Sequence, residues 1–388
     1  MSFYNPSQLV SSFEESATLA LSAKAKKLAA SGKSVINFGV GEPDFNTPKS
    51  FIEAAFKAAE KGQTKYTAVG GTPNLRETVA AKISRDYRVA YSAEEVLVSS
   101  GGKQAIFHFL QATVEPGDEV IILSPYWVSF PEMVKMVGGR PIIVNAKSQR
   151  ITADEIAAKI SPKTKAIILN SPSNPSGLVF TREEVESYSK LLLNKNIWLL
   201  CDDTYYKLIY SPAEWVSPLH LHPELKEKTC LIGSASKSYA MTGWRLGWAL
   251  GPKPLIAAMT KLQSQVTSNP SSLSQAAAEE ALKNGDSFVE DFRKIFEKRR
   301  NLVISELQKI PGLQWMEPEG AFYIFIDFSK LIPNVTDFCE KLLDRDGVCL
   351  IPGEAFGAPS YARLSYALSD ADIKEGIRRI EVGLKALT

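Results

Sequence analysis

Residues 96–124 read VLVSSGGKQAIFHFLQATVEPGDEVIILS, and this stretch decides the fold. It passes from an apolar run through a Gly-Gly turn into a helix-forming segment, and then through a Pro-Gly-Asp turn into a second apolar run. The cycle recurs as PIIVNA (141–146), a helix near 152–160, AIILNSP (166–172), a helix near 181–194, WLLCDD (198–203) and CLIGSAS (230–236). Short apolar strands that alternate with helices predict an α/β fold with a mostly parallel sheet covered by helices.

The chain changes character after Pro254, where long helices replace the alternating pattern. Three strand-like segments follow, GAFYIFIDF, VCLIPG and YARLSYAL. The flanking elements that we expect are a helix over 15–30, a short strand at 34–38, a long helix over 287–309 and a final helix ending near Leu387. We therefore predict a large domain over 47–286 and a smaller α+β domain from 1–46 and 287–388, which includes the N-terminal segment and the long interdomain helix.

The bulk composition argues against several classes of protein. Lysine and arginine (45) nearly balance aspartate and glutamate (43), so the chain lacks the basic excess of a nucleic-acid-binding protein. Its four cysteines are scattered and its three histidines show no metal-ligand spacing, which argues against a metal enzyme. The N-terminus has no signal-peptide pattern, and no apolar run approaches the roughly 18 residues that span a membrane. We expect a cytoplasmic protein.

The run SASKSYAMTGWRLGW (234–248) surrounds Lys237 with small and hydroxylated residues and places Arg245 eight positions later. A lysine amine is a nucleophile only when it is deprotonated, and an apolar setting or a neighbouring cation favours that state. A Schiff-base lysine with arginine and serine ligands for a phosphate is what pyridoxal 5'-phosphate (PLP) requires. The alternative is a mobile basic loop.

Other candidate residues follow the predicted strands. Ser100–Lys103 closes a strand and opens a helix, where free N–H groups suit a phosphate, although such a turn also serves simple chain reversal. Trp127 can stack on a flat ring or fill the core. Asn174 can donate to a ring oxygen or belong to its Pro/Gly-rich turn. No G-x-G-x-x-G dinucleotide fingerprint is present, which argues against a nicotinamide dehydrogenase.

Two further positions carry charge where a strand is expected. Asp202 and Asp203 end the run WLLCDD, and because adjacent strand residues face opposite sides, only one of them can reach a given ligand. A carboxylate beside a pyridine nitrogen would keep that nitrogen protonated, whereas the simpler role is to cap the following turn. Arg363, within YARLSYA, either extends to solvent or forms a bidentate pair with a carboxylate such as that of an amino acid.

Taken together, these segments resemble the fold-type I PLP enzymes, and closely the class I aminotransferases of the bacterial aspartate aminotransferase subgroup. The resemblance runs nearly end to end. The motifs that carry it are SATLALSAKA (16–25), GEPDF (41–45), KYTAVGGTPNLRE (65–77), SGGKQA (100–105), SPYWVS (124–129), NSPSNPSG (170–177), CDDTYY (201–206), the lysine run (234–248) and RLSYA (363–367). It implies the PLP-transferase fold type I for the large domain and ping-pong transamination as the reaction.

The resemblance also implies roles for individual residues. Lys237 would form the Schiff base and move the substrate proton, and Asp202 would pair with the ring nitrogen. Tyr205 would serve the ring oxygen beside Asn174, although the pair Asp203 and Tyr206 has the same spacing. Trp127 would stack on the cofactor ring. The residues around its phosphate would be Gly102, Lys103, Ser234, Arg245 and the partner subunit's Tyr66. Gly41, Asn174 and Arg363 would hold the substrate α-carboxylate, and Trp127 would also contact the substrate. The shared site implies a homodimer.

The expected substrates are acidic amino acids and 2-oxo acids. Dicarboxylate-specific members of the wider family often use an arginine near QSQVTSNPSS (263–272), and this stretch has none. In the bacterial subgroup a lysine in the phosphate turn, with hydroxyls from the first helix, recognises the distal carboxylate, and Lys103, Ser16 and Thr18 match. Aspartate and glutamate, with oxaloacetate and 2-oxoglutarate, are therefore expected. The alternatives are a prephenate or aromatic aminotransferase, or a PLP-dependent C–S lyase on the same fold.

Overall fold

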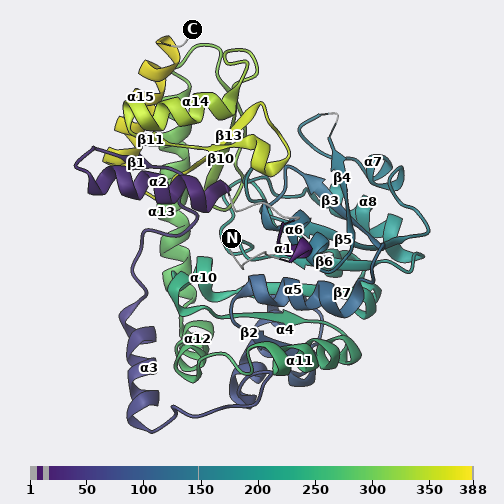
Figure 1. The fold of residues 1–388 in the computed structure, drawn as a ribbon. Coiled ribbons are helices and arrows are strands. Elements are labelled where there is room, and N and C mark those ends of the chain that lie inside the picture. The colour runs from purple at the N-terminus through teal and green to yellow at the C-terminus, as the bar shows by residue number, and fades with distance from the viewer. Residues whose placement is uncertain (1–6, 12–16, 147, 387–388) are drawn as a thin grey trace, which may run out of the picture.

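The computed structural model describes residues 7–11, 17–146 and 148–386 (Figure 1). Within them, the largest sheet has seven strands in the order β2-β8-β7-β6-β5-β3-β4. Its strands are β2 (Val96–Ser99), β3 (Glu119–Ser124), β4 (Arg140–Asn145), β5 (Thr164–Asn170), β6 (Trp198–Asp202), β7 (Thr229–Ser234) and β8 (Gly247–Leu250). β3 to β7 run parallel to one another, which confirms the predicted mostly parallel sheet.

The strand β8 differs from the others because it runs antiparallel to both of its neighbours, β2 and β7. The sequence patterns did not single it out, since its four residues begin with a glycine and the first two of them belong to the lysine run. That glycine has a packing reason: a Cβ on Gly247 would lie 2.3 Å from the backbone nitrogen of Gly102 and 2.6 Å from the carbonyl carbon of Gly101. Only a glycine lets β8 approach the turn after β2 so closely.

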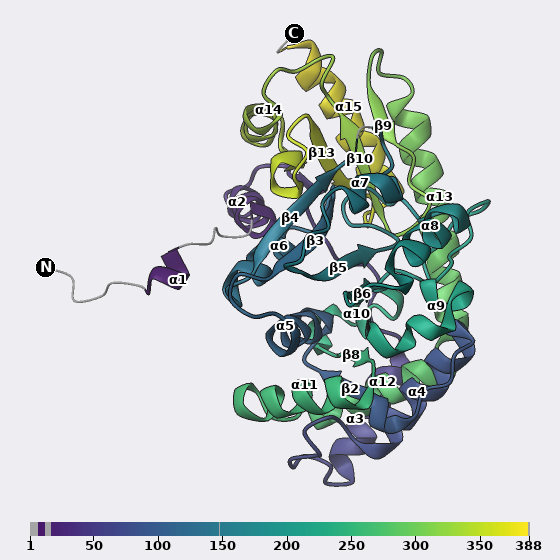
Figure 2. The same ribbon diagram turned by 90° about the vertical axis from the view of Figure 1, so that its right-hand side faces the viewer.

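Helices cover both faces of this sheet, as Figure 2 shows from the side. Successive residues of β6 face opposite sides: Leu199 and Cys201 belong to one buried cluster and Leu200 to the other. The first cluster includes α4 (Pro73–Tyr87), α8 (Arg182–Leu193) and α12 (Ser272–Asn284). The second includes α5 (Gly102–Thr113), α6 (Ser129–Met136) and α11 (Lys253–Val266). Burial on both faces explains why these strands are continuously apolar.

The C-terminal part forms a second sheet, and the N-terminal strand joins that part. The sheet is antiparallel in the order β12-β13-β10-β9, and β1 pairs in parallel with β11. These strands are β1 (Ile36–Asn37), β9 (Gln314–Met316), β10 (Tyr323–Asp327), β11 (Val348–Cys349), β12 (Ile351–Pro352) and β13 (Tyr361–Ser365). The short strand expected at 34–38 therefore finds its partner here. The helices beside them are α2 (Ala17–Ala30), α14 (Val335–Lys341) and α15 (Asp370–Lys385).

The long helix α13 (Asp286–Leu307) joins the two parts, close to the predicted 287–309 (Figure 1). Near its start, Val289 packs into the core of the large sheet. One and two turns on, Phe292 and Phe296 pack into the core of the C-terminal part. The exact division of the chain at 46/47 and 286/287 stays a prediction.

Shorter elements complete the described fold. The other α-helices are α1 (Gln8–Ser11), α3 (Lys49–Glu60), α7 (Ala153–Ala157), α9 (Pro218–Leu221) and α10 (Ala235–Ser238). Short 3₁₀ helices lie at Ala93–Glu95, Pro223–Lys228, Thr242–Trp244 and Gly353–Phe356, and a π-helical turn lies at Leu342–Asp346. No helix in the described ranges is long and apolar enough to cross a membrane.

The contact at Gly247 gives a test of the fold. We expect Gly247→Ala to lower the free energy of unfolding by about 3 kcal/mol, because the new methyl group meets backbone atoms that cannot rotate away. Gly243→Ala is the matched control, since a Cβ there meets no described atom within 4 Å. Urea unfolding measures both variants, and equal stabilities would contradict the close approach of β8 to the turn.

Candidate active site

The candidate active site is a cavity of about 260 Å³ where three parallel strands end. Asn170, Asp202 and Ser234 are the last residues of β5, β6 and β7, and all three line it. Side chains at the carboxyl ends of neighbouring parallel strands converge, and ligands of open α/β sheets bind there. The C-terminal part closes the cavity from the other side with Tyr323 and Arg363.

Lys237 lies in this cavity on α10, directly after β7. Ser234 begins the helix, because its hydroxyl accepts a hydrogen bond from the Ser236 backbone N–H at 3.0 Å. The Lys237 amine donates to the carbonyl oxygen of Gly41, a neutral partner. Burial lowers the pKa of Lys237 to about 8, and the cations of Arg363 and Arg245 act in the same direction. At pH 7 an amine with that pKa is still mostly protonated, but its uncharged, nucleophilic fraction, roughly a tenth, is far larger than that of an ordinary lysine.

Asp202 and Asp203 face opposite sides of the sheet, as strand geometry requires. Asp202 lines the cavity, and burial raises its pKa. Asp203 instead accepts a hydrogen bond from the Tyr87 hydroxyl at 2.7 Å, and burial raises its pKa to about 8. Of the two carboxylates, Asp202 is the one that the structure places beside Lys237.

Tyr205 and Tyr206, which follow the two aspartates in the chain, also point to different places: one to the cavity and the other away from it. Tyr205 lines the cavity, and its hydroxyl lies 2.8 Å from the hydroxyl of Tyr323. The Tyr206 hydroxyl donates to Asp86 at 2.9 Å, and Tyr206 is not among the residues that line the cavity. The spacing D-x-x-Y fits both pairs, but only Asp202 and Tyr205 reach the site.

Arg363 is buried on β13, with 2% of its surface exposed. Its guanidinium donates to the side-chain oxygen of Asn174 at 2.8 Å and to the carbonyl oxygen of Gly39 at 2.9 Å. Its central carbon lies 4.6 Å from the centre of the Tyr323 ring. None of these partners carries a negative charge, and the buried Nε has no hydrogen-bond partner in the described structure. The arginine is therefore available to a carboxylate ligand.

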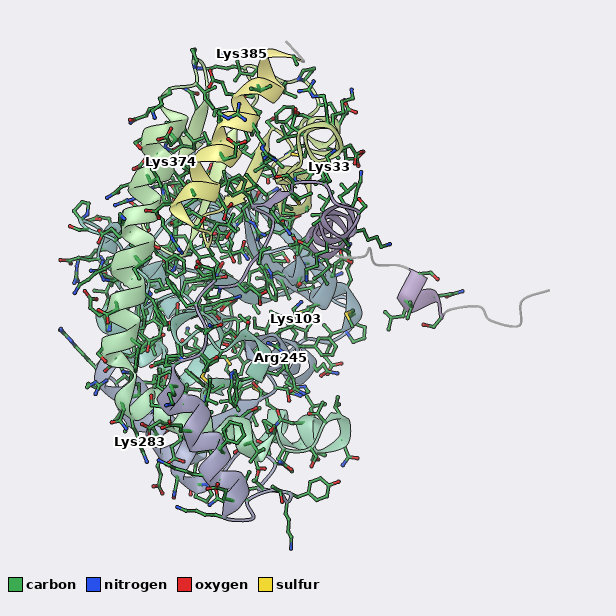
Figure 3. All side chains as sticks on the ribbon, turned by 90° about the vertical axis from the view of Figure 1, so that its left-hand side faces the viewer. Lys33, Lys103, Arg245, Lys283, Lys374 and Lys385 are labelled. Atoms are coloured by element: carbon green, nitrogen blue, oxygen red, sulfur yellow. The ribbon has the colours of Figure 1, made fainter. Side chains whose placement is uncertain are left out.

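A group of N–H and cationic donors gathers at the start of α5. Gly102 and Lys103 lie in the first turn of this helix, and Arg245 lies opposite; all three line the cavity. Gly101 adopts a positive φ of 88°, and a Cβ there would lie 2.6 Å from Nη2 of Arg245. Figure 3 shows Lys103 and Arg245 near one another in the middle of the molecule. Helix-terminal N–H groups with an arginine form an anion site.

Trp127 and Lys103 form one wall of the cavity. The Lys103 amine lies 4.8 Å from the centre of the Trp127 ring and donates to the Ser129 hydroxyl at 3.2 Å. Burial lowers the pKa of Lys103, and Arg245 adds to the effect. Thr18 of α2 also lines the cavity, and its buried hydroxyl has no partner in the described part of the chain. Ser16, the other predicted hydroxyl, lies outside the described residues.

Tyr66, which we expect at the phosphate site of the partner subunit, does not line the cavity of its own chain. It is 92% exposed and is absent from the lining. Several lining residues were in turn not predicted, among them Thr204 and Tyr323. Nothing in the sequence marks Tyr323, because an aromatic residue in the strand-like GAFYIFIDF also fits a core position. Thr204 lies between two assigned residues, and its proximity to Asp202 was the available signal.

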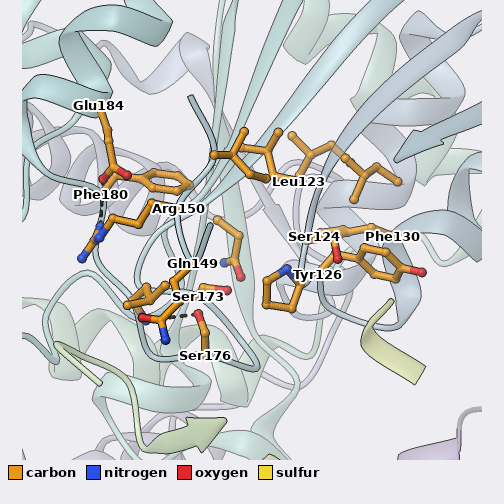
Figure 4. A pocket seen from close by; sticks show the side chains of 16 residues that line it. Leu123, Ser124, Tyr126, Phe130, Gln149, Arg150, Ser173, Ser176, Phe180 and Glu184 are labelled. Atoms are coloured by element: carbon orange, nitrogen blue, oxygen red, sulfur yellow. Dashed lines mark hydrogen bonds and ion pairs between the residues drawn. The ribbon is translucent and has the colours of Figure 1, made fainter. Parts of the chain in front are cut away.

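A second cavity of about 50 Å³ lies beside the first and shares only Asn170 with it (Figure 4). Its two charged residues, Arg150 and Glu184, pair with each other at 2.9 Å, and Arg150 also pairs with Glu319 at 2.8 Å. The reactive side chains therefore belong to the larger cavity. Among the residues that the structure describes, no cluster of three or more potential metal ligands occurs.

Comparisons with known proteins agree with this geometry. The sequence profile described as aminotransferase class I and II matches residues 33–380. The aspartate aminotransferase of Geobacillus stearothermophilus is 44% identical over 385 residues, which cover 97% of this chain and 98% of the relative. A protein of Rhizobium leguminosarum bv. phaseoli named probable aspartate/prephenate aminotransferase is 43% identical over 386 residues, 96% of each chain. The structure of Thermus thermophilus aspartate aminotransferase with maleate superposes with a TM-score of 0.94 at 39% identity, covering 98% of this chain and 100% of that one.

A lysine with a lowered pKa and an anion site lie at the strand ends of the α/β sheet, and a buried arginine faces them from the antiparallel sheet, as suits an enzyme that binds anionic substrates. By its sequence and its fold, the chain belongs to the family of class I and II aminotransferases.

The lowered pKa of Lys237 predicts how stability depends on pH. The folded value, about 8, lies below the ordinary 10.5, so the folded protein carries a buried charge at a cost below pH 8. We expect Lys237→Met to raise the free energy of unfolding by about 3 kcal/mol at pH 7. The gain should shrink as the pH rises through 8 and vanish near 10.5. Chemical denaturation of the cofactor-free protein across this range measures it.

The exposed Lys374 on α15 supplies the control for this measurement. Lys374→Met should change stability by less than about 0.5 kcal/mol at every pH. If the difference in free energy of unfolding between Lys237→Met and the parent protein stays constant from pH 7 to 10.5, the pKa of Lys237 is not lowered.

Proposed function

We propose that this chain is a PLP-dependent aspartate aminotransferase, which moves the α-amino group of aspartate or glutamate to 2-oxoglutarate or oxaloacetate. The observation that carries the proposal is Lys237, whose amine has a lowered pKa in a cavity that it shares with Asp202 and Arg363. The family and the names of its relatives support the same reaction. A C–S lyase is not favoured, because the relatives are named aminotransferases.

The residues of the cavity fit PLP. Asp202 is a buried carboxylate to which no lysine, arginine or histidine is hydrogen-bonded in the described structure, and a protonated pyridine nitrogen would supply the missing positive partner. Trp127 would stack on the PLP ring, and Asn174 and Tyr205 would form hydrogen bonds to the oxygen attached to that ring. Gly102, Lys103, Ser234 and Arg245 would hold the phosphate. PLP, when bound, supplies an electron sink for the charge that develops on the substrate α-carbon.

The chain's own residues would bind and orient the amino acid and move its proton. Arg363 would hold the α-carboxylate as a bidentate pair, beside Asn174 and Gly41. With the substrate fixed, the uncharged Lys237 amine would take the proton from the α-carbon as a general base. Arg363 is buried, and the low local dielectric strengthens its attraction for the carboxylate.

The preference for an acidic amino acid rests on the wall formed by Lys103. A distal carboxylate would pair with the Lys103 amine, with the free hydroxyl of Thr18 and with Ser16. The Thermus thermophilus enzyme of similar fold was solved with maleate, which carries two carboxylates. A lysine discriminates less sharply than an arginine, so the selectivity against prephenate and aromatic amino acids should be modest.

We further propose a cytoplasmic homodimer with shared active sites. Tyr66 is 92% exposed in its own chain, and in a dimer it would reach the phosphate site of the partner subunit. The four cysteines are free and buried in the structure, as suits the reducing cytoplasm.

Turnover with defined substrates tests the function. The purified protein, loaded with PLP, should convert aspartate and 2-oxoglutarate to oxaloacetate and glutamate with a kcat on the order of 10 s⁻¹. Lys237→Ala should lower kcat by more than about 10³-fold, because it removes both the nucleophile and the base. Lys374→Ala is the exposed control. A cysteine thioether in place of aspartate tests for a C–S lyase, because cleavage would release a thiol, pyruvate and ammonia and would form no new amino acid. An active Lys237→Ala variant would exclude Lys237 from the chemistry.

The two adjacent aspartates offer a matched pair for the cofactor site. Asp202→Asn keeps the shape of the side chain but removes the charge, and we expect it to weaken PLP binding by at least about tenfold. Asp203→Asn can still accept the hydrogen bond from Tyr87, so PLP binding should change by less than about threefold. Absorbance titration of the cofactor-free proteins measures both constants. The reverse order of effects would assign the ring nitrogen to Asp203.

A further inference from the structure

The charge on Asp202 has an unusual setting. The carboxylate ends β6 and is 6% exposed, and burial raises its pKa and so favours the neutral acid. No cation is hydrogen-bonded to it in the described structure, and Lys237 contacts the carbonyl oxygen of Gly41 instead. Under the proposed function Asp202 must nevertheless be ionised and correctly oriented. Before the cofactor binds, a neutral group has to stabilise the carboxylate.

Thr204 is that group. Its hydroxyl donates to Oδ1 of Asp202 at 2.7 Å, and its backbone N–H approaches the same oxygen at 3.3 Å. Both bonds lower the pKa of Asp202 and so oppose the effect of burial. Hydrogen bonds to a charged acceptor are roughly twice as strong as those between neutral groups, so the ionised carboxylate gains most.

The geometry also fixes which carboxylate oxygen is engaged. Both hydrogen bonds that the Asp202 side chain receives from described residues end on Oδ1, so Oδ2 keeps its acceptor capacity for a ligand. Thr204 itself lines the cavity. The neighbouring Asp203 has a separate donor, Tyr87, so Thr204 and Tyr87 serve one carboxylate each. Each of the two adjacent carboxylates thus has its own hydroxyl donor.

We propose that Thr204 is a positioning residue that holds Asp202 ionised, with Oδ2 directed to the ring nitrogen of the cofactor. This inference rests on the proposed function. Without the hydroxyl, Asp202 becomes a stronger base, and the proton shared with the ring nitrogen moves toward the carboxylate. The role belongs to the hydroxyl and not to the volume of the side chain.

The experiment compares Thr204→Val, which keeps the shape but lacks the hydroxyl, with Thr204→Ser, which keeps the hydroxyl. The probe is PLP labelled with ¹⁵N in its ring, added to the cofactor-free protein. We expect Thr204→Val to bind PLP about tenfold more weakly, with a ¹⁵N chemical shift displaced toward that of unprotonated pyridine. Thr204→Ser should match the parent protein in both measurements. A merely structural role would not move the ¹⁵N signal.

Each outcome decides between the claims. If the parent protein binds PLP and Thr204→Val leaves both affinity and chemical shift unchanged, the role of Thr204 is wrong while the proposed function stands. If the parent protein does not bind PLP, the proposed function fails and the role of Thr204 fails with it. Circular dichroism checks that the variants fold, and Thr204→Ala gives the same comparison if Thr204→Val does not.

Discussion

The site depends on holding buried charges without pairing them to one another. Lys237, Asp202 and Arg363 lie in one cavity, and a buried charge without a partner is costly. The protein meets this cost with neutral partners: carbonyl oxygens for the two cations, an amide oxygen for Arg363 and a hydroxyl for Asp202. Such partners stabilise each charge only partly. A ligand of opposite charge can therefore still bind favourably.

Much of the fold serves to bring these partners together. The parallel strands deliver Asn170, Asp202 and Ser234 to one edge, while Arg363 comes from the antiparallel sheet of the C-terminal part. The two parts meet through the segment that follows β1. Its residues Gly39 and Gly41 supply the carbonyl oxygens, and Asp44 forms a bidentate ion pair with Arg299 of α13 at 2.7 and 2.8 Å.

The sequence predicted the alternating architecture because buried parallel strands and turn residues leave strong local signals. It also predicted that only one of Asp202 and Asp203 faces the ligand, but two D-x-x-Y pairs with equal spacing could not be separated without the strand register. The strand β8 and the place of Tyr323 in the cavity were not predicted, because both depend on contacts between segments that are distant in the sequence. Tyr66 could be interpreted only through a second subunit, which no pattern within one chain can place.

The two carbonyl oxygens after β1 have a consequence for the enzyme as a whole. Gly39 faces the arginine that would bind substrate, and Gly41 faces the lysine that would abstract its proton. Because the two glycines are two residues apart on one anchored segment, any displacement of that segment alters the environment of both cations together. Substrate affinity and lysine basicity are therefore not independent quantities in this fold, and a substitution that tunes one of them through this segment also changes the other.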